Sequence, residues 1–151
     1  MKGKIFGKNN KGFTLLEVLL SVAVIGILAG AGVPIYQTLQ NRNDMDIAVS
    51  SFAQSLRRAQ LLSQAVANDT TWGVRIRPGF IILFQGQNFM GRDPNFDEEI
   101  SIPPSIRISG TPEIVFNKFT GIPQTAGTLT LTSVNNETET LTINTKGTVN
   151  Y

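Results

Sequence analysis

Hydrophobic residues follow three different patterns along the chain. Over residues 13–36 nearly every position is apolar, and Glu17 is the one charge in this run of about 24 residues. Over residues 37–67 apolar residues recur at steps of three and four, and beyond residue 68 they alternate with polar ones in short stretches. Because a helix rises about 1.5 Å per residue, the first run is long enough to cross about 30 Å of hydrocarbon. We therefore expect a transmembrane helix over residues 13–36.

The second pattern predicts that this helix continues as an amphipathic helix over residues 37–67. Its apolar positions form one stripe, about a third of the circumference, as expected for a helix that lies on a sheet. The stripe consists of Met45, Ala48, Val49, Phe52, Leu56, Ala59, Leu62 or Ser63, and Val66.

The third pattern predicts a β-rich head over residues 68–151. Residues 72–77 and 80–84 have the alternation or apolar content of strands, with a turn at Pro78-Gly79 between them, and the second is apolar on both faces. Residues 85–104 have the composition of a loop. We expect roughly six to eight short strands, in one or two antiparallel sheets packed against the helix. The others lie over residues 106–109, 113–116, 128–133 and 138–144, with a last turn at 146–147.

Basic residues are concentrated ahead of the apolar run. Residues 1–12 hold four of the 13 basic residues and none of the 11 acidic ones, so removing them changes the net charge from +2 to −2. A basic segment before a membrane helix fits the positive-inside rule, with the N-terminus in the cytoplasm and the head outside. The pI near 9.2 is then a property of the precursor and gives no argument for nucleic-acid binding.

The chain contains no cysteine and no histidine. This excludes a disulfide framework and any Cys or His metal site, and it removes the usual general base and thiol nucleophile. No Gly-x-Ser-x-Gly motif and no Gly-rich phosphate loop is present in the sequence. We therefore expect neither an enzyme nor a cofactor.

Two polar patterns leave other kinds of binding open. Asp93, Asn95 and Asp97 have the spacing of the start of a calcium loop, without the glycine and the distal glutamate that such a loop requires. The alternative is a solvated acidic loop that faces partners. A basic stripe for nucleic acid would form if the fold gathered five arginines, and the alternative is a set of solvated side chains. These arginines are Arg57, Arg58, Arg75, Arg77 and Arg107.

The junction between the basic segment and the apolar run reads KGFTLLE over residues 11–17. It resembles the prepilin cleavage and methylation motif of type IV pilins and type II secretion pseudopilins. The resemblance implies that a prepilin peptidase removes residues 1–12 by cutting between Gly12 and Phe13, that Phe13 is then N-methylated, and that Glu17 guides assembly. The alternative is an ordinary secretory signal peptide, cut among the small residues 29–32.

Glu17 is costly in hydrocarbon, by a few kcal/mol, unless it is paired or protonated. It could reach the membrane interface, or it could meet a positive partner. In the family this partner is the freed amine of Phe13 on a neighbouring subunit, and opposite charges attract strongly in a medium of low dielectric constant.

Small residues and one proline follow in the same run. Gly26 and Gly30 have the spacing that lets helix backbones approach closely in lipid, and Gly32 continues the series. Pro34 predicts a kink, because its ring and missing amide hydrogen disfavour a straight helix. By resemblance to several pilin filaments, residues 26–34 are the candidate segment that loses helical order on polymerisation.

The head is similar to the GspH/FimT subgroup, which comprises the H-type pseudopilins and T-type minor pilins. The matching pieces are residues 52–60, 116–121 and 141–147. DNA-binding T-type minor pilins carry arginines after the last glycine of this pattern, whereas Gly147 is followed by Thr-Val-Asn.

These observations predict an α+β, pilin-like lollipop, with a long N-terminal helix packed on an antiparallel β-sheet head. The expected function is a structural subunit, a minor pilin or pseudopilin, of a type IV pilus or type II secretion pseudopilus. We expect it in the bacterial inner membrane as a single-pass protein and then in the filament. The expected partners are other subunits, the prepilin peptidase, the inner-membrane assembly platform and membrane lipid, and do not include nucleic acid. The alternatives are a filament-displayed binding module, for DNA uptake or adhesion, and a major pilin.

Overall fold

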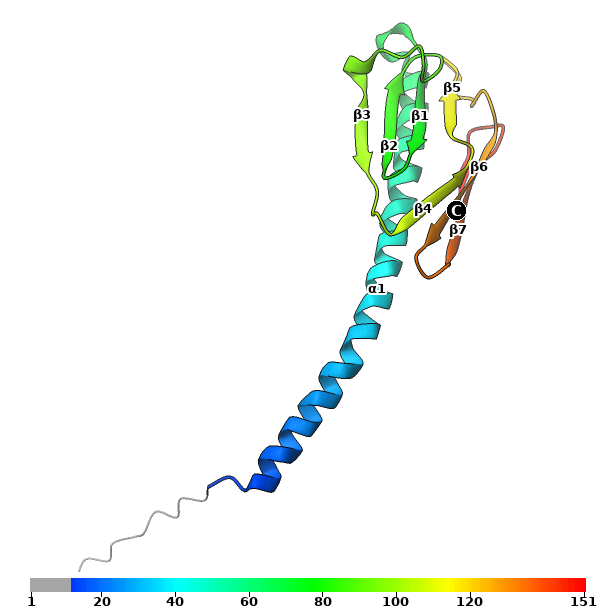
Figure 1. The fold of residues 1–151 in the computed structure, drawn as a ribbon. Coiled ribbons are helices and arrows are strands. Elements are labelled where there is room, and N and C mark those ends of the chain that lie inside the picture. Colours follow the sequence, from blue (N-terminus) through cyan, green and yellow to red (C-terminus); the bar gives the residue numbers. More distant parts are fainter. Residues whose placement is uncertain (1–11) are drawn as a thin grey trace, which may run out of the picture. The chain divides into compact units, whose positions relative to one another are not determined.

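The computed structural model describes residues 12–151, and the side chains of residues 31–35 lie outside this description. Of the predicted leader, residues 1–12, only Gly12 is among the described residues. Two compact units divide the chain, Met1–Thr38 and Leu39–Tyr151, which we call the N-terminal unit and the globular unit. Figure 1 shows a helix followed by a strand-rich region. The elements are α1 (Leu15–Gln64), η1 (Ala67–Asp69), β1 (Trp72–Arg77), β2 (Phe80–Gln85), η2 (Pro94–Phe96), β3 (Glu98–Ser101), β4 (Ile106–Gly110), β5 (Glu113–Phe116), β6 (Gly127–Ser133), β7 (Thr138–Ile143) and β8 (Val149–Asn150).

Helix α1 begins directly after Thr14, which acts as its N-cap. The backbone N–H of Glu17 donates to Thr14 Oγ1 at 3.2 Å, which satisfies one of the amides that the first turn leaves without a helical partner. Glu17 is the third residue of the helix, so Thr14 and Glu17 have the spacing of a capping box. The side chain of Thr14, a residue of the prepilin-like motif, therefore caps the start of the helix.

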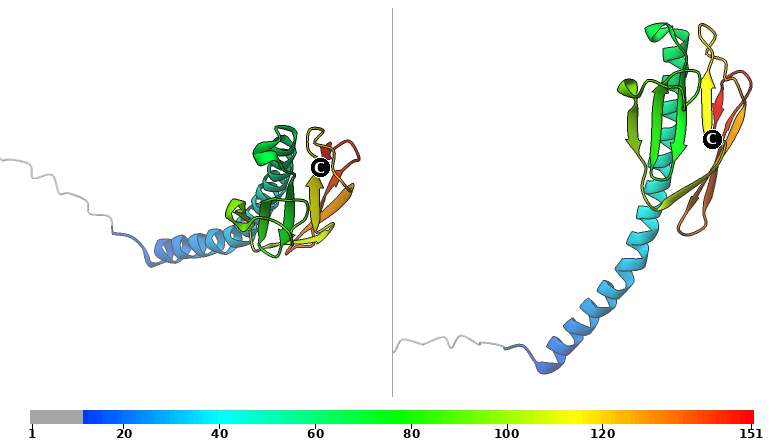
Figure 2. Two further views of the ribbon diagram at one scale, coloured as in Figure 1. Left: turned by 90° about the horizontal axis from the view of Figure 1, so that it is seen from above. Right: turned by 45° about the horizontal axis from the view of Figure 1, so that its top comes forward.

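Within the globular unit, α1 presents the predicted apolar stripe to the core. The two views in Figure 2 place this part of α1 against β1 and β2. Phe52 and Leu56 are among the largest fully buried side chains, and they pack with strand residues in one hydrophobic cluster. The prediction of one buried face is confirmed for Met45, Ala48, Val49, Phe52, Leu56 and Ala59.

The helix ends at Gln64, earlier than the predicted boundary at residue 67. Val66, the last predicted member of the stripe, has a left-handed backbone (φ 55°) and lies outside the helix. Ser63 ties the end of the helix to β1, because its Oγ accepts from the N–H of Trp72 at 2.9 Å. The indole N–H of Trp72 donates to the carbonyl of Ala67 at 3.0 Å. These bonds turn the chain back onto the sheet, and the periodicity of side chains does not report them.

The eight strands found in residues 12–151 form two four-stranded sheets, and every pair is antiparallel. The first has the order β3-β2-β1-β5 and the second the order β4-β6-β7-β8. In the first, Val74 of β1 lies between Leu83 of β2 and Ile114 of β5. In the second, β6 and β7 align so that Leu129 faces Leu141. The predicted α+β class, with antiparallel sheets after a long helix, is confirmed.

The predicted loop over residues 85–104 is partly wrong, because β3 lies within it. Strand β3 pairs with β2 from Phe80↔Ser101 to Leu83↔Glu98. Ile100 and Ile102 alternate with polar residues and turn toward the core, where Ile102 is buried. The high content of acidic residues and prolines hid this short alternation.

Strand β2 is apolar on both faces, as its sequence predicts. Ile81 and Leu83 belong to the main cluster between α1 and the sheets. Ile82 and Phe84 face the other side of the sheet, where Phe89 from the following loop covers them in a second cluster. The rings of Phe84 and Phe89 meet edge to face, with centroids 5.5 Å apart. The loop therefore acts as a lid over a second, smaller core.

Two glycines of the subgroup-like pieces lie against the end of α1. Gly121 (φ 63°) and Gly147 (φ 83°) both have left-handed backbones, and an added Cβ would collide with the side chains of Gln64 and Gln60 respectively. Gln60 Nε2 also donates to the carbonyl of Gly121 at 3.0 Å. The left-handed backbone therefore favours glycine at both positions, and a side chain there would also displace Gln64 or Gln60.

Candidate functional site

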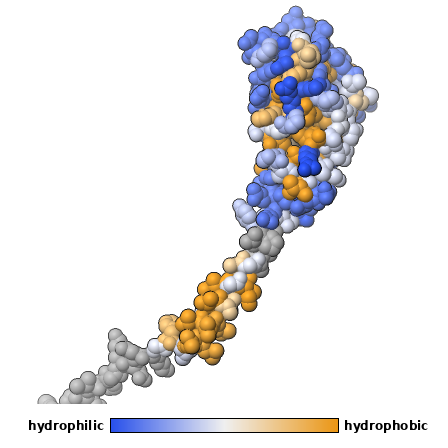
Figure 3. Space-filling model, in the orientation of Figure 1, coloured by the Kyte–Doolittle hydropathy of each residue, from blue (hydrophilic) through white to orange (hydrophobic). Residues whose placement is uncertain are grey.

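The N-terminal unit carries a long apolar surface that the described chain does not cover. Phe13 is 83% exposed, and the large apolar side chains over residues 15–28 are exposed on all sides of the helix. On the face drawn in Figure 3, hydrophobic residues cover this segment. An apolar surface of this extent calls for lipid or another helix as a neighbour. The other large exposed residues of the run are Leu15, Leu16, Val18, Leu19, Leu20, Val22, Val24, Ile25, Ile27 and Leu28.

No helix among the described residues combines the length and the hydropathy expected of a membrane span.

Glu17 lies in the first turn of α1. This position is favourable for an acidic side chain, because the N-terminal end of a helix carries partial positive charge. Thr14, which the sequence interpretation did not single out, holds the backbone of this turn through its hydroxyl. The Thr-x-x-Glu spacing was a signal that could have revealed it. The structure thus shows Thr14 capping this turn and Glu17 at a position that suits a negative charge, while the assembly role of Glu17 stays a prediction.

The glycines of the run have open surroundings. A Cβ added to Gly26 or Gly30 would meet no atom within 4 Å. Packing among the described residues therefore does not explain why these two positions lack a side chain. Gly32 and Pro34 lie in the stretch whose side chains are not described, and α1 is one continuous helix across it. Loss of helical order over residues 26–34 in a filament stays a prediction.

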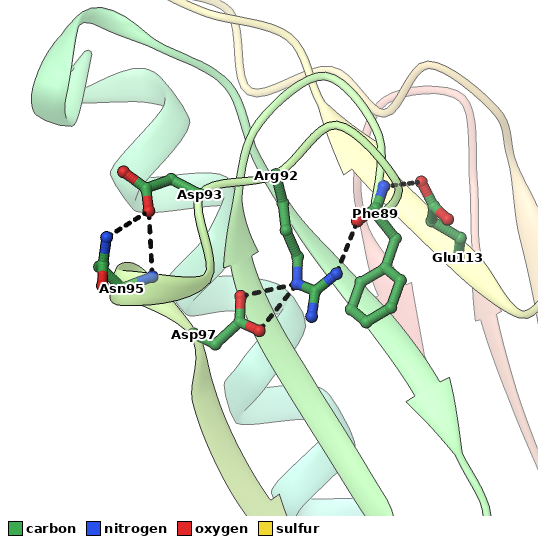
Figure 4. Close-up of polar contacts among 6 residues, drawn as sticks. All are labelled: Phe89, Arg92, Asp93, Asn95, Asp97 and Glu113. Carbon is green, nitrogen blue, oxygen red and sulfur yellow. Dashed lines mark hydrogen bonds and ion pairs between the residues drawn. The ribbon is translucent and has the colours of Figure 1, made fainter.

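The acidic residues of the loop over 85–97 bind protein groups, as Figure 4 shows. The Asp97 carboxylate accepts two hydrogen bonds from Arg92 Nε, at 2.7 and 3.0 Å. Asp93 caps η2 by accepting from the backbone and side-chain nitrogens of Asn95. The carboxylates of Asp93 and Asp97 are thus engaged in separate contacts. Among residues 12–151 there is no cluster of three or more potential metal-binding side chains.

Phe89 is the centre of a cluster of cations on the outer side of the first sheet. The guanidinium of Arg92 lies 3.7 Å from the centroid of the Phe89 ring, and those of Arg77 and Arg75 lie at 5.2 and 5.5 Å. The backbone N–H of Phe89 donates to Glu113, which also pairs with Arg75 at 3.0 Å. These contacts hold the lid closed over Phe84, so the cluster has a structural explanation.

The five arginines that the alternative of a nucleic-acid stripe would need do not act as one positive surface. Arg58 forms an ion pair with Glu98 at 2.5 Å, and Arg75 is paired with Glu113. Both charges are therefore neutralised by a neighbour. Arg77 and Arg107 are brought together differently, because both line a groove between the two sheets.

The loop over residues 117–121 is fixed beside the end of α1. Lys118 Nζ donates to Asp69 Oδ1 at 2.6 Å, and this hydrogen bond, together with the charge of Lys118, holds the pKa of Asp69 below its usual value. The N–H of Phe119 donates to the carbonyl of Ser63 at 3.1 Å. The loop thus closes the same corner of the fold that Gly121 packs against.

Known proteins match both parts of the chain. Residues 7–33 match the family model described as a prokaryotic N-terminal methylation motif. Two fimbrial proteins of Pseudomonas aeruginosa are 30% identical over 103 residues, which is 63% of this chain and 67% of each relative. The fold is similar to that of the minor pseudopilin EpsH from the type 2 secretion system of Vibrio cholerae. That match has a TM-score of 0.54 and 17% identity, and it covers 70% of this chain and 93% of EpsH.

The fimbrial relatives match over most of their length, the methylation motif includes the glycine–phenylalanine junction, and a long helix precedes antiparallel sheets. The chain therefore belongs to the type IV pilin and pseudopilin family, whose members are structural subunits that assemble with one another.

Proposed function

We propose that the chain is a minor subunit of a type IV pilus or a type II secretion pseudopilus. It is made as a precursor of the bacterial inner membrane, with a single span over residues 13–36 and the globular unit outside the cytoplasm. A prepilin peptidase removes residues 1–12 by cutting after Gly12, and Phe13 is then N-methylated. The observation that carries this proposal is the apolar surface of the N-terminal unit, which stays exposed along the described part of the run.

This apolar surface contacts lipid before assembly and other subunits after it. In the membrane, lipid covers it and the inner-membrane assembly platform receives it. In the filament, the helices of other subunits replace lipid. Glu17 then pairs with the amine of Phe13 on a neighbouring subunit, because each charge alone is costly in that setting. Gly26 and Gly30 support close approach between helices, since their surroundings are open.

A second function, ligand binding by the globular unit, is favoured by one observation. An apolar groove lies open between its two sheets. Binding of DNA has less support, because Arg58 and Arg75 are paired with carboxylates and Gly147 is followed by Thr-Val-Asn instead of arginines.

Cell fractionation tests the proposed assembly. In cells that contain the prepilin peptidase, we expect the chain in both the inner membrane and the filaments sheared from the assembly machinery. Without the peptidase we expect it in the membrane alone. If the chain reaches filaments equally well without the peptidase, or never enters filaments in cells that make them, the proposal is wrong.

A further inference from the structure

A groove of about 500 Å³ lies between the two sheets, where β1 ends and β4 runs past it. Its apolar lining includes Ile76 from β1, Ile106 and Ile108 from β4, and Leu129 from β6. This volume is within the usual range for ligand sites. In the view of Figure 3, hydrophobic residues gather in the part of the globular unit where β4 crosses, with strongly hydrophilic residues among them.

Strand β4 borders this groove with an unpaired edge. It is the first strand of its sheet, and within the described part of the chain it pairs with β6 alone. The N–H of Thr111 donates to the carbonyl of Thr128, so these two residues form a hydrogen-bonded pair of the ladder between β4 and β6. Because hydrogen-bonded and non-hydrogen-bonded pairs alternate in an antiparallel ladder, Ile108 directs its N–H and C=O away from β6. An edge of this kind is a template for another strand.

The other side of the groove, at the end of β1, also has backbone that is not paired with a strand. Strand β5 pairs with β1 only as far as Arg75↔Glu113. One further hydrogen bond, from the N–H of Ile76 to the carbonyl of Pro112, closes the contact at 2.9 Å. No strand among residues 12–151 pairs with the end of β1 at Arg77 on this side, so the two sheets leave an open space between β1 and β4.

The groove has positive charge that the chain does not balance. Arg77 and Arg107 both line it, and both are exposed. Among the described residues, the five ion pairs involve neither of them, and the contact of Arg77 with the Phe89 ring leaves its charge without a carboxylate partner. In each strand the arginine is next to an isoleucine that lines the groove. Because successive side chains of a strand point to opposite faces, the arginines and the isoleucines lie on different faces of their strands.

We propose that this groove binds an extended segment of another protein in which apolar and acidic residues alternate. The segment adds to β4 as a further strand and bonds to the free N–H and C=O of Ile108. Its apolar side chains face Ile76 and Ile106, and the alternate carboxylates face Arg77 and Arg107. A strand of four residues spans about 13 Å. This inference concerns the globular unit alone and holds whether or not the chain enters a filament.

Peptide binding to the full chain in detergent micelles tests the proposal, with fluorescence anisotropy as the measurement. The probe is a short peptide of alternating valine and glutamate, blocked at both ends so that only its side chains carry charge. We expect it to bind, and we expect a valine–lysine peptide not to bind. We also expect binding to be lost when alternate peptide nitrogens on one edge are methylated, because that edge can no longer donate to β4.

Two variants locate the site. The double variant Arg77→Glu/Arg107→Glu is expected to weaken binding by about tenfold or more, since both attractive charges become repulsive. Arg57→Glu changes an exposed arginine of α1 that does not line the groove, and it is expected to change binding by about twofold or less. Far-UV circular dichroism and the fluorescence of Trp72 confirm that each variant is folded.

Three outcomes would overturn the proposal. The first is the absence of binding by the valine–glutamate peptide. The second is equal binding by its methylated form, or binding that the groove variants leave unchanged. The third is self-association of the chain that excludes the peptide and disappears in the double variant, because a second copy would then be the occupant.

Discussion

Replacing Glu17 by leucine is expected to reduce the amount of the chain in sheared filaments by about tenfold or more, and to leave its amount in the inner membrane unchanged. The apolar run becomes more hydrophobic, so insertion is not impaired. The Phe13 amine of the neighbouring subunit, however, loses its partner in hydrocarbon. An unpaired charge there costs a few kcal/mol, and each 1.4 kcal/mol is about a factor of ten in an equilibrium. Quantitative immunoblots of membrane and filament fractions provide the measurement.

A glutamine at the same position separates charge from helix capping. Glutamine keeps the Thr14-x-x-Gln form of the capping box, whereas leucine does not. If the charge guides assembly, Glu17→Gln is as defective as Glu17→Leu. Normal filament incorporation of the glutamine variant would instead assign Glu17 to the start of α1 alone and contradict the charge pair.

Replacing Phe52 by alanine is expected to lower the free energy of unfolding of the globular unit by about 3–5 kcal/mol. Phe52 is 0% exposed and lies at the centre of the cluster between α1 and the two sheets. The loss therefore includes both the transfer of the ring from water and the cavity that it leaves. Urea unfolding of the full chain in detergent, followed by the fluorescence of Trp72, measures the effect, because Trp72 is the single tryptophan and is buried.

Leu61 provides a matched control on the same helix. Its side chain is 63% exposed, so Leu61→Ala is expected to change the free energy of unfolding by about 0.5 kcal/mol or less. Equal shifts of the urea midpoint in the two variants would show that the face of α1 bearing Phe52 is not the buried one.

Much of the fold follows from local patterns in the sequence. The stripe from Met45 to Ala59 identifies the buried face of α1, because side chains three and four apart share one side of a helix. The hairpin of β1 and β2 follows from Pro78-Gly79 between apolar runs. Both features depend on neighbours in the chain, so the sequence alone is sufficient to predict them.

The errors concern contacts between distant segments. Helix α1 ends at Gln64 because Ser63 and Ala67 bond to Trp72, which side-chain periodicity does not report. Strand β3 was hidden because its alternation is short and lies among charged residues. Phe89 resembled part of a polar loop, although it is the lid on the second core.

The candidate sites also include one that depends on neighbouring residues and others that depend on contacts between distant segments. The motif over residues 11–17 is local, and it was identified from sequence, although Thr14 within it was overlooked. The groove was not predicted, because Ile76, Ile108, Arg77 and Arg107 meet only when two separate sheets come together. The ion pairs of Arg58 and Arg75 could not be predicted for the same reason, since the positions of Glu98 and Glu113 beside them depend on strand pairing.

The chemical identity of the N-terminus in the filament tests the central claim most directly. Intact-mass and N-terminal peptide mass spectrometry of the chain from sheared filaments should show that it begins at Phe13 and carries one methyl group on the Phe13 nitrogen. A chain that still begins at Met1 in those filaments, in cells with an active prepilin peptidase, would contradict the account. The amine that pairs with Glu17 would then not exist.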